Sequence, residues 1–378
     1  MDFALSEEQE MLRNSARDFL TKECPKTLVR QMETDEKGYS PNLWKGMADL
    51  GWMGLVFPEA YGGSGMTFLD LAVLIEEMGR ALVPAPFLPT VVYCGLPILA
   101  AGTDEQKKHF LTGIAKGEMI LTLALTEPSA TWDAGGVTVK ATAEGDNFVI
   151  DGTKLFVPDA HIANYLLVVA RTKEGKHKED GITLFLVDAK SPGIKLNALK
   201  TMGSDKQFEI IFNKVKVTKK NILGKLDHGW AVIQDLLPKA TLAQCALMVG
   251  GSQQVLEMTV NYAKERVQFG KPIWSFQAIQ HKCADMIIDV DGSRFITYKA
   301  AWSLEENEPD AEMLASMAKA WCSEATRRVV AHGQQIHGGI GFTKDYKIQL
   351  YFRRQKWMEL MWGDADYHRE LVAQKLEV

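Results

Sequence analysis

The sequence predicts a mainly α-helical protein with a β domain in the middle of the chain. Apolar residues recur at helical spacing over residues 1–120 and 227–378, whereas over residues 121–226 they alternate with polar residues as in half-buried strands. The C-terminal part holds three long amphipathic segments joined by short connections, which is typical of a helix bundle. We therefore expect an N-terminal helical domain, a middle β domain and a C-terminal helical bundle with these limits.

Two capping boxes mark helix starts in the N-terminal region. Ser6 is followed three residues later by Gln9, and Thr103 by Gln106. In such a box the hydroxyl accepts from a backbone N–H of the first turn, and the glutamine side chain reaches back to the N–H of the capping residue. Both positions are expected to begin a helix.

The middle region shows strand periodicity around turn signals. The stretch VTVKATAEGDNFVIDGTKLFV alternates on either side of a turn at Glu144–Asn147. The polar stretch TKEGKHKEDG, between two β-branched and apolar runs, is expected to form a solvated hairpin loop. We interpret this region as a small barrel or sandwich.

Composition and charge exclude several classes of function. The chain has 378 residues, 46% of them apolar, and a formal net charge of -5, so nothing favours binding to nucleic acid or to an anionic membrane. No apolar run approaches the roughly 18 residues of a membrane-spanning helix. The acidic start is unlike a signal or transit peptide, and a cytoplasmic location is expected.

The cysteines favour neither disulfides nor a metal site. The number of cysteines is odd, and none forms a CxxC motif or lies at metal-binding spacing from a histidine. We expect reduced, buried thiols and no bound metal. The five residues are Cys24, Cys94, Cys245, Cys283 and Cys322.

Three motifs are candidates for binding a phosphate-containing ligand. In ERVQFGKPI, Arg266 stands at a helix end and could clamp a phosphate, although such arginines are more often simply solvated. In QQIHGGIGF, Gly338 and Gly339 would let a backbone approach a pyrophosphate, although glycines also simply end helices. In LTEPS, Thr126 offers a hydroxyl near a turn, where most threonines have no binding role.

Taken in order, these motifs resemble those of the acyl-CoA dehydrogenase family over essentially the whole chain. The similarity runs through PEAYGGSG, GTDEQKKHFLTGIAKGE, LTEPSATWD, ERVQFGKPIWSFQ and QIHGGIGF. It implies an N-terminal helical domain, a middle β-barrel and a C-terminal four-helix bundle. It also implies FAD as cofactor and α,β-desaturation of an acyl-CoA thioester. A glutamate base would take the α-proton, and an electron-transferring flavoprotein would accept the electrons.

The stretch LMWGDADYHRE departs from this family at the base. The resemblance places the glutamate at Trp362, and an indole can donate a proton but has no basic lone pair. Some relatives carry their base early in the first bundle helix, where this chain has Ala240 and Thr241. Asp364, two residues after Trp362, is a candidate for a relocated base. Alternatively Asp364 simply begins the last helix, where acidic residues suit the helix dipole, and Trp362 is a packing residue.

Further departures affect the site for the chain's own flavin ring, while a second set of positions is intact. Trp132 stands where the family has a pyrophosphate-contacting serine, and Phe156–Pro158 replaces the segment that hydrogen-bonds the ring. The Arg-x-Ser-x-Thr stretch is lost in MGSDKQFE. The intact positions are those that, by resemblance, reach a neighbouring subunit's FAD: Arg266, Phe269, Gln277, Gln335, Gly338 and Gly339.

This division predicts a supporting chain in a hetero-oligomeric acyl-CoA dehydrogenase, most simply with two copies of each chain. The ending WGDADYHRE also resembles the smaller chain of two-chain members of the family. A partner chain would supply the glutamate base. One alternative is a self-sufficient homo-oligomer that uses Asp364. Another is a non-catalytic relative that binds CoA or a partner protein.

Overall fold

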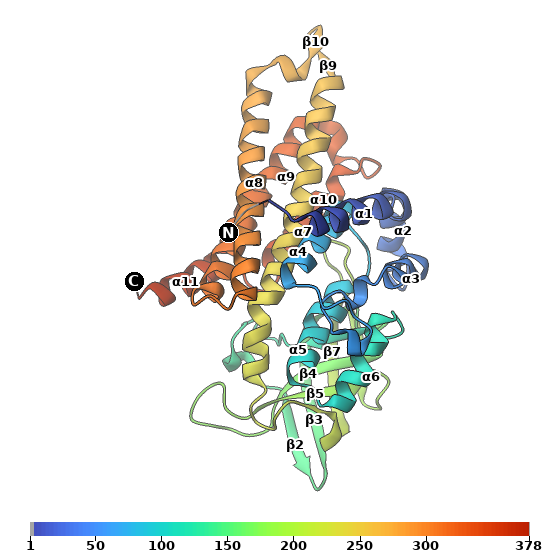
Figure 1. Cartoon of the computed structure of the whole chain (residues 1–378), viewed down its shortest axis with the longest axis vertical. Helices are drawn as coiled ribbons and strands as arrows, with labels where there is room; N and C mark the ends of the chain where they lie inside the picture. Colours follow the sequence, from blue (N-terminus) through green and yellow to red (C-terminus); the bar gives the residue numbers. More distant parts are fainter. Residues whose placement is uncertain (1–3, 378) are drawn as a thin grey trace.

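The computed structural model, which describes residues 4–377, has the predicted order of an N-terminal helical domain, a middle β domain and a C-terminal helical domain (Figure 1). The limits 1–120, 121–226 and 227–378 stay predictions. The helices of the N-terminal domain are α1 (Glu7–Glu23), α2 (Lys26–Thr34), α3 (Pro41–Asp49), α4 (Phe68–Ala81), the π-helix η3 (Leu88–Gly95), α5 (Leu96–Ala101) and α6 (Asp104–Ala115).

Both predicted capping boxes are present. The hydroxyl of Ser6 accepts from the N–H of Gln9 at 3.2 Å, and the Gln9 side chain accepts from the N–H of Ser6 at 3.1 Å. Thr103 and Gln106 make the same two bonds at 3.2 and 3.0 Å. These bonds satisfy N–H groups that a helix leaves free at its start, which fixes where α1 and α6 begin.

The β domain is one eight-stranded sheet with strand order β6-β7-β3-β2-β4-β5-β8, and β1 pairs in parallel with β4. The predicted turn joins β2 to β3, where Glu144 pairs with Asn147, and the polar stretch 172–181 links the antiparallel strands β4 and β5. The strands are β1 (Leu121–Ala124), β2 (Lys140–Glu144), β3 (Asn147–Pro158), β4 (Tyr165–Arg171), β5 (Ile182–Asp188), β6 (Ile194–Leu199), β7 (Gln207–Thr218) and β8 (Ile222–Leu223).

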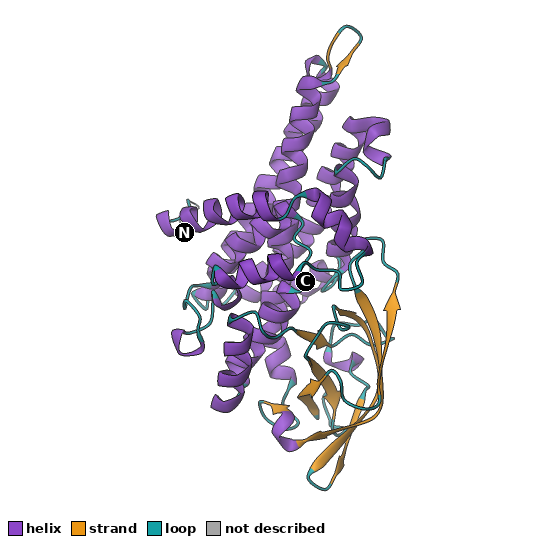
Figure 2. Cartoon of the chain, turned by 90° about the vertical axis from the view of Figure 1, so that its right-hand side faces the viewer, coloured by secondary structure: helices purple, strands orange, loops and turns teal. Residues whose placement is uncertain are grey.

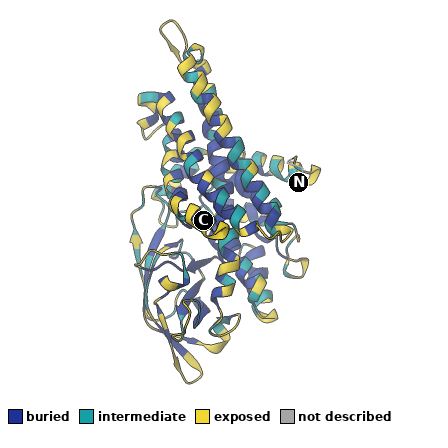
Figure 3. Cartoon of the chain, turned by 90° about the vertical axis from the view of Figure 1, so that its left-hand side faces the viewer, coloured by how far each residue is buried: buried dark blue, intermediate teal, exposed yellow. Residues whose placement is uncertain are grey.

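The C-terminal domain is built on three long helices that run along the length of the molecule. At the end farthest from the sheet, the first two are joined by a short hairpin (Figures 1 and 2). The elements are α7 (Trp230–Glu265), β9 (Val267–Gln268), β10 (Lys271–Pro272), α8 (Gln277–Glu305), α9 (Ala311–His337), α10 (Ile348–Leu360) and α11 (Ala365–Leu376). Buried residues line the inward faces of the helices, and the hairpin is exposed (Figure 3).

The expectations about cysteines, metals and membranes can be compared with residues 4–377. All five cysteines are buried and free. Within this range no cluster of three or more histidine, cysteine, aspartate or glutamate side chains is placed to hold a metal ion. None of the helices in the same range is long and apolar enough to cross a membrane.

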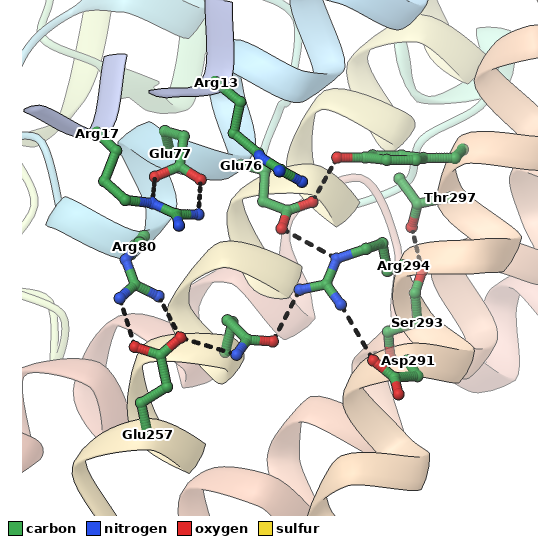
Figure 4. Close-up of polar contacts among 12 residues, drawn as sticks. Arg13, Arg17, Glu76, Glu77, Arg80, Glu257, Asp291, Ser293, Arg294 and Thr297 are labelled. Carbon is green, nitrogen blue, oxygen red and sulfur yellow. Dashed lines mark hydrogen bonds and ion pairs between the residues drawn. The ribbon is translucent and has the colours of Figure 1, made fainter. Parts of the chain in front are cut away.

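Helix α4 is joined to the bundle and to α1 by buried carboxylates (Figure 4). Glu77 accepts from Arg17 of α1 at 2.6 and 3.0 Å. Glu76 accepts from Nε of Arg294 at 3.1 Å and from the hydroxyl of Tyr298 at 2.7 Å, both from α8. The side chains of both glutamates are at most 7% exposed, so each depends on its partners to offset the loss of hydration.

A third ion pair extends this network to α7. Arg80, in the last turn of α4, forms a two-pronged ion pair with Glu257 of α7. The amide of Gln253 donates to Glu257 at 2.9 Å, while its oxygen accepts from Arg294 at 2.8 Å. These ion pairs fix α1, α7 and α8 relative to α4, and so they join the N-terminal domain to the C-terminal domain.

We predict that Glu76→Gln lowers the free energy of unfolding by about 2–3 kcal/mol, because it leaves the partly buried Arg294 with only the half-exposed Asp291 as a charge partner. Urea denaturation followed by circular dichroism measures the change. The control is Lys45→Met, which removes an exposed ion pair to Asp49 and should cost less than about 1 kcal/mol. Equal effects of the two variants would contradict the role assigned to Glu76.

Candidate functional site

Trp362 is buried where the three domains meet. It lies in the turn between α10 and α11, is 5% exposed, and has a left-handed backbone with φ of 63°. Its indole N–H donates to the hydroxyl of Tyr93 at 3.2 Å, and the two rings are 4.8 Å apart at an edge-to-face angle of 76°. Trp132 contacts its other side with a ring separation of 5.5 Å. Tyr93 belongs to η3 and Trp132 to the β domain, so one aromatic side chain from each domain forms this cluster.

Lys319 of α9 fixes the backbone on either side of Trp362. Its ammonium is fully buried and donates to the carbonyl oxygens of Glu359 at 2.9 Å and Gly363 at 2.6 Å. The hydroxyl of Ser323 lies 3.3 Å away. Burial lowers the pKa of Lys319 to about 8. The carbonyl groups at the end of α10 therefore have a cationic partner in place of water.

His368 holds the same turn from the side of α11. Its Nε2 donates to the carbonyl oxygen of Trp362 at 2.8 Å, and burial lowers its pKa to about 4. The imidazole is therefore neutral at pH 7, with its proton on Nε2. It positions the turn but carries no charge near it.

Asp364 begins the last helix. Its carboxylate accepts from the N–H of Tyr367 at 3.0 Å as the N-cap of α11, and the residue is exposed. Asp366 forms an ion pair with Arg369 at 2.8 Å. The acidic run therefore supplies the cap and first turn of α11, as the simpler interpretation of this sequence expected. Asp364 lines none of the three cavities described below.

The first cavity, here the bundle cavity, has a volume of about 360 Å³ and lies where α7 and α9 begin and α11 runs. Trp132 and Trp362 form part of its wall together with Thr241. Ala240, the neighbouring position where some relatives carry a base, is also buried. The single acidic side chain among its lining residues is Glu312, which is half exposed and pairs with Lys375 at 3.0 Å.

The second cavity, the β-domain cavity, has a volume of about 340 Å³ and is mainly apolar. Thr126, Trp132 and Phe156 line it. Phe156 is held in a left-handed conformation with φ of 52°. Pro158, which ends β3, offers only a carbonyl group, and this group accepts from Thr122 at 2.6 Å.

A buried ion pair beside this cavity was not predicted from the sequence. Glu127, beside Thr126, accepts from Lys154 of β3 at 2.6 Å, and both side chains are at most 1% exposed. It also accepts from the backbone N–H groups of Thr138 and Val139 at 2.8 and 3.1 Å. The acceptor positions of this carboxylate are filled, so its role is structural. The sequence did contain a sign of this ion pair. Lys154 lies on the same inward face of β3 as Phe148 and Ile150, and a buried lysine needs an acidic partner.

The second predicted set lies at the far end of the bundle. Arg266 ends α7, the hairpin carries Phe269 with 92% exposure, and α8 begins at Gln277. Gln335 is exposed near the end of α9, where Gly338 has φ of 59° and no atom within 4 Å of an added Cβ. The β domain occupies the other end of the long axis (Figure 1), and its cavity, which Thr126 lines, borders the end of α10. The two predicted sets therefore lie in different parts of the chain.

Comparison with known proteins identifies the family. Models of the N-terminal, middle and C-terminal domains of acyl-CoA dehydrogenases match residues 6–118, 122–215 and 227–377. The chain belongs to the acyl-CoA dehydrogenase family. Members of this family are FAD flavoproteins and oxidoreductases that act on CH–CH bonds, so the resemblance, the fold, the cofactor and the enzyme class expected from the sequence are confirmed.

Three relatives illustrate the extent of the similarity. A probable acyl-CoA dehydrogenase, YngJ of Bacillus subtilis, is 36% identical over 382 residues and covers 100% of both chains. Subunit CarC of the caffeyl-CoA reductase–Etf complex of Acetobacterium woodii is 34% identical and covers 97% of this chain and 98% of its own. A structure of the ChsE4–ChsE5 complex from Mycobacterium tuberculosis has a TM-score of 0.90 and 29% identity, covering 100% of this chain and 99% of that one.

The residues present fit FAD unequally at the two ends of the chain. At the far end of the bundle, an exposed guanidinium and open glycines suit a pyrophosphate, because the first can bind bidentately and the second allow close approach. At the β-domain cavity, Trp132 occupies the expected serine position and Pro158 has no N–H to offer. When bound, the flavin supplies hydride chemistry, and protein groups supply orientation.

We predict that Lys319→Met removes a pH dependence of stability. Between pH 8 and 10.5 the unfolded chain keeps the proton of Lys319 while the folded chain loses it, so the free energy of unfolding rises with pH over this range. The rise attributable to Lys319 is on the order of 3 kcal/mol.

The measurement is the difference between wild type and Lys319→Met in urea titrations from pH 7 to pH 11. Taking the difference matters because Lys26 and Lys154 also have their pKa lowered to about 8. A difference that does not change with pH would show that Lys319 keeps its proton in the folded chain.

Proposed function

We propose that this chain is the supporting subunit of a hetero-oligomeric, FAD-dependent acyl-CoA dehydrogenase. The observation that carries the proposal is the burial of Trp362, at the position where the family places its glutamate base, between Tyr93 and Trp132. An indole cannot take the α-proton of a thioester.

The acidic side chains near Trp362 in the sequence and in the bundle cavity are already paired or engaged in capping. Asp364 is exposed and committed to capping α11, and Glu312 is paired at the rim of the bundle cavity. Thr241 is a hydroxyl, and Ala240 is apolar. His368 donates its Nε2 proton to the carbonyl of Trp362, and burial lowers its pKa to about 4, so its unpartnered Nδ1 is a weak base. A base supplied by a second chain agrees with all of these contacts.

The exposed set at the far end of the bundle gives this chain a role in that assembly. Arg266, Gln277 and Gln335 would hold the phosphates and adenosine end of an FAD whose ring lies in the partner subunit. Two similar proteins support such partners, since one was solved as a ChsE4–ChsE5 complex and the other belongs to an Etf complex. We infer that the partners are a glutamate-bearing family member and an electron-transferring flavoprotein, with an acyl-CoA as substrate.

We predict that the chain expressed alone carries little or no FAD and no dehydrogenase activity, and that both appear when it is co-expressed with a glutamate-bearing partner. In the pair, Arg266→Gln should weaken FAD binding about tenfold or more, because it removes a charge-assisted contact to phosphate. Absorbance near the flavin band of the purified proteins and fluorescence titration with FAD measure both effects.

The matched control is Lys264→Gln, which removes another exposed cation from the last turn of α7. It should leave the affinity for FAD within about twofold of the wild type, as expected for a solvated charge. A yellow, active homo-oligomer of this chain alone would refute the hetero-oligomer proposal.

We predict that Asp364→Asn leaves the activity of the pair unchanged within about twofold. Asparagine caps a helix about as well as aspartate, so the start of α11 is kept while the carboxylate is lost. Steady-state rates with the acyl-CoA that the pair oxidises provide the measurement. A loss of a hundredfold or more with an unchanged thermal midpoint would instead identify Asp364 as the base.

A further inference from the structure

A third cavity lies where the N-terminal domain, the β domain and α10 meet. This inner cavity has a volume of about 110 Å³. Met78, Leu82, Phe87, Leu88 and Met358 give it an apolar wall. The opposite wall is polar and is formed by Asp159, Asp205, Gln207, Arg354 and Trp357.

Unpartnered polar atoms concentrate at this polar wall. Of the fourteen buried side-chain nitrogen and oxygen atoms that have no hydrogen-bond partner within residues 4–377, five belong to residues lining the inner cavity. They are Oδ2 of Asp205, both amide atoms of Gln207, Nε of Arg354 and Nε1 of Trp357. A buried donor or acceptor left without a partner costs about 1–3 kcal/mol, so such a concentration indicates a bound polar group.

Gln207 defines the chemistry of that group. The residue begins β7 and is 2% exposed, yet neither end of its amide is bonded. A carboxamide with both ends open is complementary to a second group that presents a carbonyl beside an N–H, because two parallel hydrogen bonds then form. Trp357 and Arg354 add donors near it, and Asp205 adds an acceptor.

The charges around the cavity favour a neutral ligand. The carboxyl groups of Asp159 and Asp205 are balanced by the cations of Arg354 and Lys206. Burial, and secondly the neighbouring Asp205, raise the pKa of Asp159 to about 7. A charged ligand would disturb this balance among buried groups, where uncompensated charge is costly.

We propose that the inner cavity binds a small neutral lactam or primary amide with an apolar body. The volume of about 110 Å³ is somewhat smaller than the cavity of about 150 Å³ that is known to hold benzene, which limits the ligand to a single small ring or a short chain. A flavin ring system is too large for it. The inner cavity adjoins the sites already described, because Tyr93 and Pro158 also line it and because Gln207 and Trp357 also line the β-domain cavity. The proposed ligand differs from FAD and from an acyl-CoA, so its binding is tested separately from the proposed function.

The probe for this site is the five-membered lactam 2-pyrrolidone, titrated by calorimetry into the protein in the oligomer in which it is purified. Cyclopentanone has the same ring without the N–H and should bind about tenfold more weakly. Butyrate and butylamine carry charges and should not bind measurably. A crystal soaked with 2-pyrrolidone should show the lactam paired with the amide of Gln207.

Gln207→Leu should weaken the binding of 2-pyrrolidone about tenfold or more, because it removes both amide contacts. It should not destabilise the protein without ligand, because it replaces unbonded polar atoms with apolar ones. The matched control is Gln334→Leu, at another buried glutamine with an unpartnered amide oxygen that does not line the inner cavity. This variant should bind 2-pyrrolidone like the wild type.

Three results would overturn the proposal. The first is water alone in the cavity with no binding of any probe. The second is equal weakening by Gln207→Leu and Gln334→Leu. The third is binding of lumiflavin in place of 2-pyrrolidone, since this would assign the polar wall to a flavin ring. Failure of the lactam to bind would leave the hetero-oligomer proposal unaffected, since that is decided by FAD content and activity.

Discussion

The geometry of the site depends on the buried ammonium group of Lys319. It links the end of α10 to the turn before α11 by donating to the carbonyl oxygens of Glu359 and Gly363. A helix end buried without partners is unstable, and here the partner is a cation on a neighbouring helix. The turn is therefore rigid before any ligand binds. Whatever residue occupies position 362 is held against η3 and the β domain, and in this chain that residue is a tryptophan.

An indole at this position changes the energetics of the whole junction. A carboxylate buried beside Tyr93 and Trp132 would need to be neutralised or paired, whereas Trp362 needs only one acceptor for its N–H and finds it in the hydroxyl of Tyr93. Large aromatic side chains also bury extensive surface, so the contact between three domains gains stability. Trp362 therefore gives the junction a stabilising contact and needs no charged partner.

Much of the fold was predictable from the sequence, because periodicity and capping are local signals. The boxes at Ser6 and Thr103, the turn before Asn147 and the capping role of Asp364 all follow from short-range chemistry. The partners of Glu76 and Lys319 could not be predicted in this way, since these bonds join residues that are far apart in the chain. Resemblance placed Trp362 at the site of the base, but its contacts with Tyr93 and Trp132 depend on how the three domains pack.

The two halves of the candidate site share no lining residue, since one lies at the junction of the domains and the other at the far end of the bundle. Effects of substitutions at distant positions without shared partners add, so replacing groups around the β-domain cavity carries no energetic consequence for Arg266 or Gly338. The far end of the bundle is exposed and contributes little to the core. Folding therefore places few constraints on which residues occupy it, and ligand binding can determine them. Under the proposed function, such a chain would lack its own base while keeping the surface that completes a neighbour's cofactor site. The structure has this combination of a closed junction and an open far end.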